Sequence, residues 1–454
     1  CGGKNNNNNT ITEETVIDAR ENNFLAALFS TEVAAGIAWV DLSTGRFRVS
    51  EVAPARIADE LGRVGPAELL WVNDLDERYP ELHAELSAEF GHRVTARDPW
   101  RFDRDTSTRK LTEHFGVKTL EGFGVQADSP VVPAAGCLIE YLEETQRTAC
   151  DHIHALEVVE TGDHLVLDRA TRSTLELVVT QREGRKEGTL LTAIDRTLTP
   201  MGGRMTREWL LSPLRDVEAI LHRQGGVAEF HTQHNLRDRA REELAEIADL
   251  ERLAAKISTA RANGRDLAGL AASLRPVAPL SEALTGCDSL ALSSLAAELD
   301  PLEDLVHTIE GTLAEDLPTT IKEGALIREG VSEELDELRS IARDGKSWMV
   351  QFQATESERT GISNLKIGFN SVFGYFLEVP RGQVERVPEE WVRKQTIKTA
   401  ERYITPELKE FETKVVNSEE RSKELEYDLF CSLRDEVAGE LRRVLATARA
   451  VATT

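Results

Sequence analysis

The sequence predicts an α/β amino-terminal domain followed by a mainly α-helical region, with a small β-rich segment inserted between two long helices. Three observations predict this: strand-like and helix-like patterns alternate over residues 10–135, helical periodicity dominates from about residue 137, and period-two alternation returns only within 365–403. The 454 residues are enough for about three domains, and 41% of them are hydrophobic, which is typical of a globular protein. Neither a signal peptide nor an apolar run of ~18 residues is present, so no membrane association is expected.

The amino-terminal elements are predicted from short patterns. Four stretches are rich in β-formers, and the second and third of them flank a Gly-containing turn that suits a hairpin. The predicted strands are 24–29, 36–42, 46–49 and 68–72, and a helix is predicted over 55–61. Asp41, on the hairpin, could suggest a nuclease, but that chemistry needs a cluster of carboxylates around two metals and no partners can be assembled. We therefore expect a structural role for Asp41.

Two long helices are predicted further along the chain. Ser332 can cap the first, whose first turn carries Glu333 and Glu334, and Thr405 followed by Pro406 is a strong start signal for the second. The apolar stripe of the first runs Leu335, Leu338, Ile341, Trp348, Phe352. The stripe of the second runs Leu408, Phe411, Val415, Leu425, Leu429, Leu433, Val437, Leu441, Leu445. Both stripes are narrow, so the two helices are expected to pack as an antiparallel pair over 332–361 and 404–451.

Charge distinguishes the inserted segment from the rest of the chain. The whole chain has 54 basic and 79 acidic residues, a net charge of −25, and only 13 of the basic residues are lysines. This balance favours adaptation to high salt, the alternative being an acidic protein from a GC-rich coding sequence, and it argues against nucleic acid as a partner of the whole surface. Residues 362–403, however, carry seven basic and five acidic side chains.

A polyanion would bind at a positively charged segment of an otherwise negatively charged protein. The ordinary explanation of such charges is a strand face exposed to solvent. The candidate DNA-binding residues are Lys366, Asn370, Arg393, Lys394, Lys398 and Arg402. Such side chains would contact phosphates, and would position the chain on DNA without reading its sequence.

Cysteine usage and the amino terminus add little chemistry. The five cysteines are scattered and odd in number, which suggests a reducing cytoplasm and no disulfide framework. Cys150, His152 and His154 lie close together, but no second ligand pair stands at zinc spacing, so no metal site is expected. Residues 1–9 are low in complexity and are expected to be disordered, and the start at Cys1 suggests a fragment.

Several long motifs resemble the MutS family of DNA mismatch repair proteins. Residues 365–379 and 393–408 are similar to that family's clamp, and 167–177, 199–205 and 209–216 are similar to its core domain. The resemblance covers nearly the whole chain from Thr10. It implies a ribonuclease-H-like connector without nuclease activity at 10–135, a core and lever domain at 136–361, a clamp at 362–403 and a returning lever helix at 404–454.

The resemblance also implies a function, with two departures. The family's mismatch-reading domain would precede Thr10 and its ATPase domain would follow Thr454, and no G-x-x-x-x-G-K-[ST] phosphate loop occurs here. We therefore expect no catalytic residues, cofactor or metal in this segment. A full-length parent would be an ATPase that uses ATP and Mg²⁺, binds mismatched duplex DNA as a homodimer, and meets a MutL-type partner through the connector.

Two alternatives remain. One is a family member devoted to recombination junctions, which naturally lacks the mismatch-reading domain. The other is a helical scaffold whose basic tip binds protein rather than DNA.

Overall fold

The structure is a computed structural model that describes residues 18–146, 153, 155–160, 162, 164–370, 372 and 374–454. It divides into two compact units. The first comprises residues 1–262, 269–306 and 437–454, and the second comprises 263–268 and 307–436. None of the helices in the described part of the chain is both long enough and apolar enough to cross a membrane.

The first unit begins with a six-stranded mixed sheet. Its strands are β1 (Phe24–Ser30), β2 (Ala35–Asp41), β3 (Phe47–Val52), β4 (Glu68–Val72), β5 (Val94–Arg97) and β6 (Leu156–Val158), in the order β5-β4-β1-β2-β3-β6. The β1–β2 and β2–β3 pairs are antiparallel, whereas β4, β5 and β6 join their neighbours in parallel. The four strands predicted from the sequence are all present.

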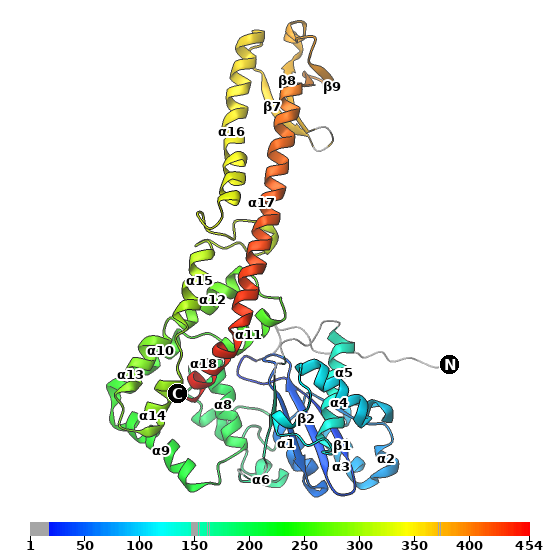
Figure 1. Ribbon diagram of the computed structural model, residues 1–454, viewed down its shortest axis with the longest axis vertical. Helices are drawn as coiled ribbons and strands as arrows, with labels where there is room; N and C mark the ends of the chain where they lie inside the picture. The colour runs from blue at the N-terminus through cyan, green and yellow to red at the C-terminus, as the bar shows by residue number, and fades with distance from the viewer. Residues whose placement is uncertain are drawn as a thin grey trace. The chain divides into compact units, whose positions relative to one another are not determined.

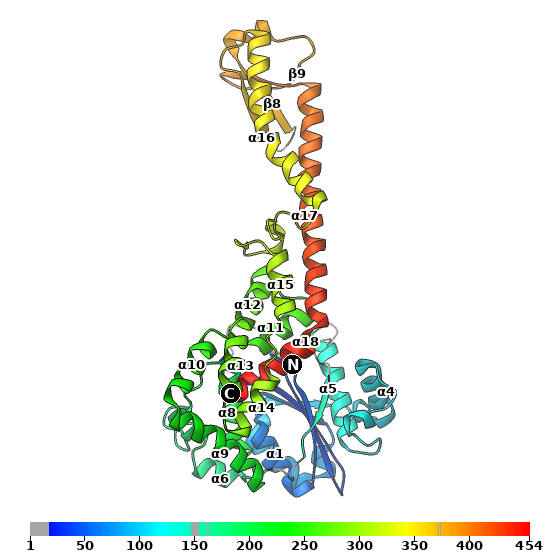
Figure 2. The same cartoon turned by 60° about the vertical axis from the view of Figure 1, so that its left-hand side comes forward.

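Helices cover both faces of this sheet because its central strands are apolar on both sides. Along β1, Leu25 and Ala27 belong to one buried cluster, and Ala26 and Leu28 belong to another, as the period of two requires. The first cluster includes α4 (Arg104–Phe115) and α5 (Val131–Gln146), and the second includes α1 (Ile57–Val64) and α3 (Pro80–Phe90). Figure 2 shows α5 and α1 on opposite sides of the sheet. A short α2 (Leu75–Arg78) precedes α3.

In the structure, the α/β domain ends later in the chain than the sequence suggested. The boundary that the sequence suggested after residue 135 falls inside α5, and Leu138, Ile139 and Leu142 are fully buried in the cluster that also holds Leu25. Beyond α5, β6 pairs with β3. The domain therefore extends to residue 158, because an apolar helix and a short edge strand complete its core.

Asp41 has the structural role expected of it. Its carboxylate is buried and accepts hydrogen bonds from the backbone N–H of Ser43 at 2.9 Å and from the Ser43 hydroxyl at 2.7 Å. It also accepts one from the backbone N–H of Asn23 at 3.4 Å. Asp41 thus closes the β2–β3 turn.

The rest of the first unit is helical. It comprises α6 (Arg169–Thr174), α7 (Leu190–Ile194), α8 (Pro200–Leu211), α9 (Val217–Thr232), α10 (His234–Ala245), α11 (Leu250–Ser258), α13 (Val277–Thr285), α14 (Leu290–Glu298), part of α12 (Gly264–Leu274) and of α15 (Glu303–Thr312), and α18 (Leu441–Thr453). Side chains cap several of these helices; Thr199 accepts from the backbone of Gly202 at α8, and Asp249 accepts from that of Arg252 at α11.

The second unit contains the two long helices, which lie alongside each other in Figure 1. These are α16 (Glu333–Thr360), capped by Ser332 as expected, and α17 (Pro406–Gly439), of which residues to 436 belong to this unit. Trp348 of α16 stacks on Phe411 of α17 with ring centroids 3.8 Å apart, and Glu334 pairs with Arg421. Early residues of one helix therefore meet late residues of the other, so the pair is antiparallel.

The second long helix is shorter than the sequence suggested. One helix was expected to continue to residue 451, but it ends at Gly439 and a separate helix, α18, begins at Leu441. Glycine weakens a helix by roughly 1 kcal/mol, and Arg443 binds Asp300 and Asp304 just after the break. The break lets Val444, Ala448 and Val451 of α18 become buried against α8 and α11.

The middle of the α17 stripe is also not what was expected. Leu425 and Leu429 are only half-buried, and the buried positions are instead Ser418, Ser422, Glu426 and Phe430. The buried face of α17 is thus largely polar in its middle, because it runs through Ser418, Ser422 and Glu426 and not through the leucines.

Candidate nucleic-acid interface

A small antiparallel sheet, the clamp sheet, lies between the ends of α16 and α17 in the sequence. Its strands are β7 (Lys366–Asn370), β8 (Gly374–Pro380), β9 (Val392–Thr396) and β10 (Ala400–Ile404), in the order β7-β8-β10-β9. A 3-10 segment, η7 (Arg381–Arg386), follows β8. Figure 1 shows this sheet at one end of the helix pair.

Aromatic packing attaches the clamp sheet to both long helices. Leu377, Val379, Trp391 and Tyr403 are buried together from β8, β10 and the segment before β9. Trp348 packs on this cluster and stacks on Phe352 as well as on Phe411. The clamp sheet therefore has its own apolar core.

Gly374 is required where β8 begins. Its φ is +83°, a conformation that L side chains rarely adopt, and a Cβ placed there would lie 1.8 Å from a carboxylate oxygen of Glu412. The glycine thus allows the β7–β8 hairpin to approach α17.

Arg402 is held within the sheet rather than presented to solvent. Cross-strand pairing places Lys366 opposite Glu378, Glu378 opposite Arg402, and Arg402 opposite Gln395. The Arg402 guanidinium donates to Glu378 at 3.1 Å and to Gln395 at 2.8 Å, and lies over the Phe376 ring. The side chain of Arg402, on β10, thus links its own strand to β8 and to β9.

Lys394 and Arg393 lie on the edge strand β9, all of whose residues are exposed. The pairing of β9 with β10 shifts between Arg402 and Tyr403, so that Gln395 and Arg393 have partners and Lys394 has none. A residue left out of the ladder in this way sits in a β-bulge, which redirects its side chain. Arg393 is exposed and lies 3.6 Å from Glu401.

Lys398 occupies the turn between β9 and β10, and the structure brings a further arginine beside it. The backbone N–H of Arg381 donates to the carbonyl of Thr399 at 3.2 Å. Both Arg381 and Lys398 are exposed. Arg381 was counted in the charge of the insert but was not proposed as a site residue, because only the β8–β10 register places it next to this turn.

The remaining candidates are Lys366 and Asn370, on β7. Lys366 is exposed, whereas the side-chain oxygen of Asn370 accepts from the backbone N–H of Val372 at 2.8 Å and so shapes the β7–β8 turn. Within the described ranges, the side chains of Lys366, Arg381, Lys394 and Lys398 form neither a hydrogen bond nor an ion pair with any residue.

The pKa values of two tyrosines of the clamp sheet, Tyr375 and Tyr403, are raised, and burial is the largest cause in both. Burial and the hydrogen bond that its hydroxyl donates to Glu401 at 2.6 Å raise the pKa of Tyr403 to about 12. Tyr403 therefore stays neutral and holds the carboxylate of Glu401, which lies 3.6 Å from the guanidinium of Arg393.

No group of metal-ligating side chains was found among the residues that the structure describes. The cluster of Cys150, His152 and His154 lies outside those residues, as do residues 1–9.

Comparison with known proteins identifies the family. Residues 23–154 match the family model described as MutS domain II, and residues 170–454 match the one described as MutS domain III. The chain therefore belongs to the MutS family. It has the α/β domain, helical core and small antiparallel sheet that the resemblance implied.

Curated relatives agree with this assignment. A protein of Symbiobacterium thermophilum named DNA mismatch repair protein MutS is 41% identical over 98% of this chain and 51% of its own length. A protein of the same name from Salinibacter ruber is 41% identical over 94% of this chain and 47% of its own length. The chain thus spans about half the length of the curated relatives it matches.

Proposed function

We propose that the clamp sheet of this chain contacts the sugar–phosphate backbone of duplex DNA within a DNA mismatch repair protein. The observation that supports this most directly is the set of exposed cations on the sheet. Lys366, Arg381, Lys394 and Lys398 have no carboxylate partner among the described residues, on a chain whose net charge is −25. Cations without a carboxylate partner make the surface locally positive, and such a surface attracts a polyanion even when the protein as a whole is acidic.

In this proposal the helix pair of α16 and α17 carries the clamp sheet to the DNA. The full-length parent would use ATP and Mg²⁺ to control closure of a homodimer around mismatched DNA, would contact a MutL-type partner through the first domain, and would act in the cytoplasm. These properties rest on family membership. The names of the relatives favour mismatch repair over the junction-binding alternative.

The salt dependence of binding to a matched duplex tests the role of the clamp sheet. Binding affinity should fall with salt by a slope of about −0.9 per contacted phosphate on a double-logarithmic plot. If Lys394 and Lys398 each contact one phosphate, the double variant Lys394→Gln/Lys398→Gln should be shallower by about 1.8 on the same relation. A matched control is Arg109→Gln/Lys118→Gln, which removes two exposed cations from the first domain.

The expected result is weak binding that the clamp variant reduces and the control variant leaves unchanged. Equal affinities for the clamp variant and the unaltered chain would reject the clamp sheet as the contact surface. Absence of binding to any duplex at low salt would instead support the protein-binding scaffold.

Two further properties follow from the same proposal. Matched and mismatched duplexes should bind this chain equally, because phosphate contacts carry no information on base pairing. The isolated chain should not hydrolyse ATP, and turnover that responds to substitutions within the chain would contradict this.

A further inference from the structure

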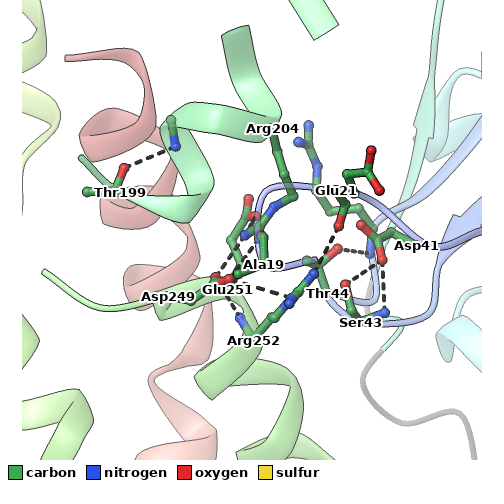
Figure 3. A network of polar contacts seen from close by, with 12 residues as sticks. Ala19, Glu21, Asp41, Ser43, Thr44, Thr199, Arg204, Asp249, Glu251 and Arg252 are labelled. Carbon is green, nitrogen blue, oxygen red and sulfur yellow. Dashed lines mark hydrogen bonds and ion pairs between the residues drawn. The ribbon is translucent and has the colours of Figure 1, made fainter. Parts of the chain in front are cut away.

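Residues 18–23 run directly before β1 and are held by two arginines of the helical core (Figure 3). We call this segment the strap. Arg204 of α8 donates to the carbonyl of Ala19 at 2.7 Å, and Arg252 of α11 donates to the carbonyls of Asp18 at 3.2 Å and Glu21 at 2.9 Å. Three of the strap's first four carbonyls therefore accept hydrogen bonds from guanidinium groups.

The arginine that holds Ala19 is itself fixed by a buried ionic network (Figure 3). Arg204 is 4% exposed and binds both oxygens of Asp249, at 2.7 and 2.8 Å, and Glu251 at 2.7 Å. Burial alone would lower the pKa of Arg204, but the carboxylates outweigh it and hold that pKa above its ordinary value. One guanidinium on α8 therefore joins the start of α11 to the strap through charge-assisted hydrogen bonds.

Side chains add a second set of ties between the strap and the core. Arg20 binds Asp195 at 3.0 Å and the carbonyl of Thr197 at 2.9 Å. Lys186 binds Asp18 at 3.0 Å and Glu21 at 2.8 Å. These contacts are more exposed than the Arg204 network, and each is worth little by itself.

The other end of the strap is tied to the first domain. The carbonyl of Asn23 accepts from the backbone N–H of Leu42 at 3.1 Å, and the Asn23 N–H donates to Asp41. A span of six residues thus connects the α8–α11 pair to the edge of the β2–β3 hairpin, and it leads without interruption into the central strand β1.

Helix α18 packs against the same two helices that hold the strap. It contacts both α8 and α11, and Val444, Ala448 and Val451 are buried there. Arg443, at the start of α18, fixes that helix to Asp300 and Asp304. A displacement of α18 must therefore change the spacing of α8 and α11 or lose buried apolar contact.

We propose that the strap couples the position of α18 to the first domain. When α18 shifts, α8 moves relative to α11, the Arg204 network is pulled apart, and the strap detaches from the core while it stays joined to β1. The first domain then loses one of its attachments to the helical core. This coupling needs neither DNA nor nucleotide, and it goes beyond the proposed contact of the clamp sheet with DNA.

Native-state hydrogen exchange of the full chain tests the coupling. Arg443→Met removes ion pairs of α18 and touches no residue of the strap, so amide exchange in the strap should rise at least tenfold if the two are coupled. The matched control is Arg101→Met, which likewise removes an arginine that is bound to carboxylates, Glu140 and Glu144, but within the first domain. This control should leave exchange in the strap unchanged.

A second variant keeps the test decisive if Arg443→Met folds poorly. Ala448→Leu overpacks the buried face of α18 without removing a charge, and should also raise exchange in the strap. Arg252→Met removes two of the strap's hydrogen bonds directly. The amide exchange of the strap in this variant shows how large the increase is when the strap loses contacts to the core. Faster exchange in α18 with unchanged exchange in the strap, in either α18 variant, would overturn the proposal.

Discussion

Replacing Glu426 by alanine is expected to loosen the middle of the pair of long helices. The Glu426 side chain is buried on α17 and accepts from the backbone N–H of Leu326 at 2.9 Å. Its other oxygen accepts from Arg339 of α16 at 2.9 Å, and the same arginine donates to the carbonyl of Ile327 at 2.8 Å. One carboxylate therefore joins α16, α17 and the chain at 326–327.

The size of the effect follows from what the substitution leaves unpaired. Breaking a buried ion pair by removing one partner costs about 3–5 kcal/mol. The Arg339 side chain is 24% exposed, so water can solvate it in part and the lower end of that range applies. The Leu326 N–H also loses its acceptor, a cost of about 1–3 kcal/mol that overlaps with the first. We expect a total near 3 kcal/mol, which corresponds to roughly a 150-fold change in an equilibrium constant.

Hydrogen exchange at the Leu326 amide measures this directly, because that N–H donates to the missing carboxylate. Glu426→Gln should cost about half as much, since its amide oxygen can still accept from Leu326 but the charge opposite Arg339 is gone. Glu424→Ala, at an exposed position on the same helix, is the control. Unchanged protection of Leu326 in Glu426→Ala would show that the buried carboxylate does not hold these segments together.

Three further predictions concern other parts of the chain. Gly374→Ala should destabilise the clamp sheet by more than about 1 kcal/mol in exchange measurements, whereas Gly382→Ala, where a Cβ meets nothing within 4 Å, should not; equal effects would contradict the steric argument. Phe430→Ala should cost about 3–5 kcal/mol in urea denaturation, and Leu429→Ala, half-buried, clearly less; the reverse order would contradict the observed stripe. Hydrogen bonds, first from the strap's own backbone and then from a lysine, hold the pKa of Asp18 below its ordinary 3.8. Asp18→Asn should therefore be less stable than the unaltered chain at pH 6, and this difference should vanish as the pH falls well below 3.8; a difference that persists in acid would contradict the assignment.

The sequence by itself determined the elements whose signals are local. Ser332 and Thr405–Pro406 predicted two helix starts correctly, because capping depends on neighbours within one turn. Period-two alternation predicted the β-rich insert, since a pleated strand imposes that period whatever it pairs with. The motifs that resemble the MutS family were likewise readable without a structure, and the family models confirm that assignment.

Only the tertiary structure decided which of those residues meet. Strand register places Arg402 against Glu378, leaves Lys394 in a bulge and brings Arg381 to the Lys398 turn. Register is set by pairing between segments, so it is not encoded in the spacing of charges along one strand.

The same reason applies to the buried polar groups. Glu426 and Arg204 look like ordinary surface charges in the sequence, and each is buried because residues at least 45 positions away supply its partners. A charged side chain can be buried only where opposite charges and donors converge on it, and that convergence is a property of the folded chain. The sequence thus determined which elements form, whereas the packing of distant segments decided which charges stay exposed and which hold the fold together.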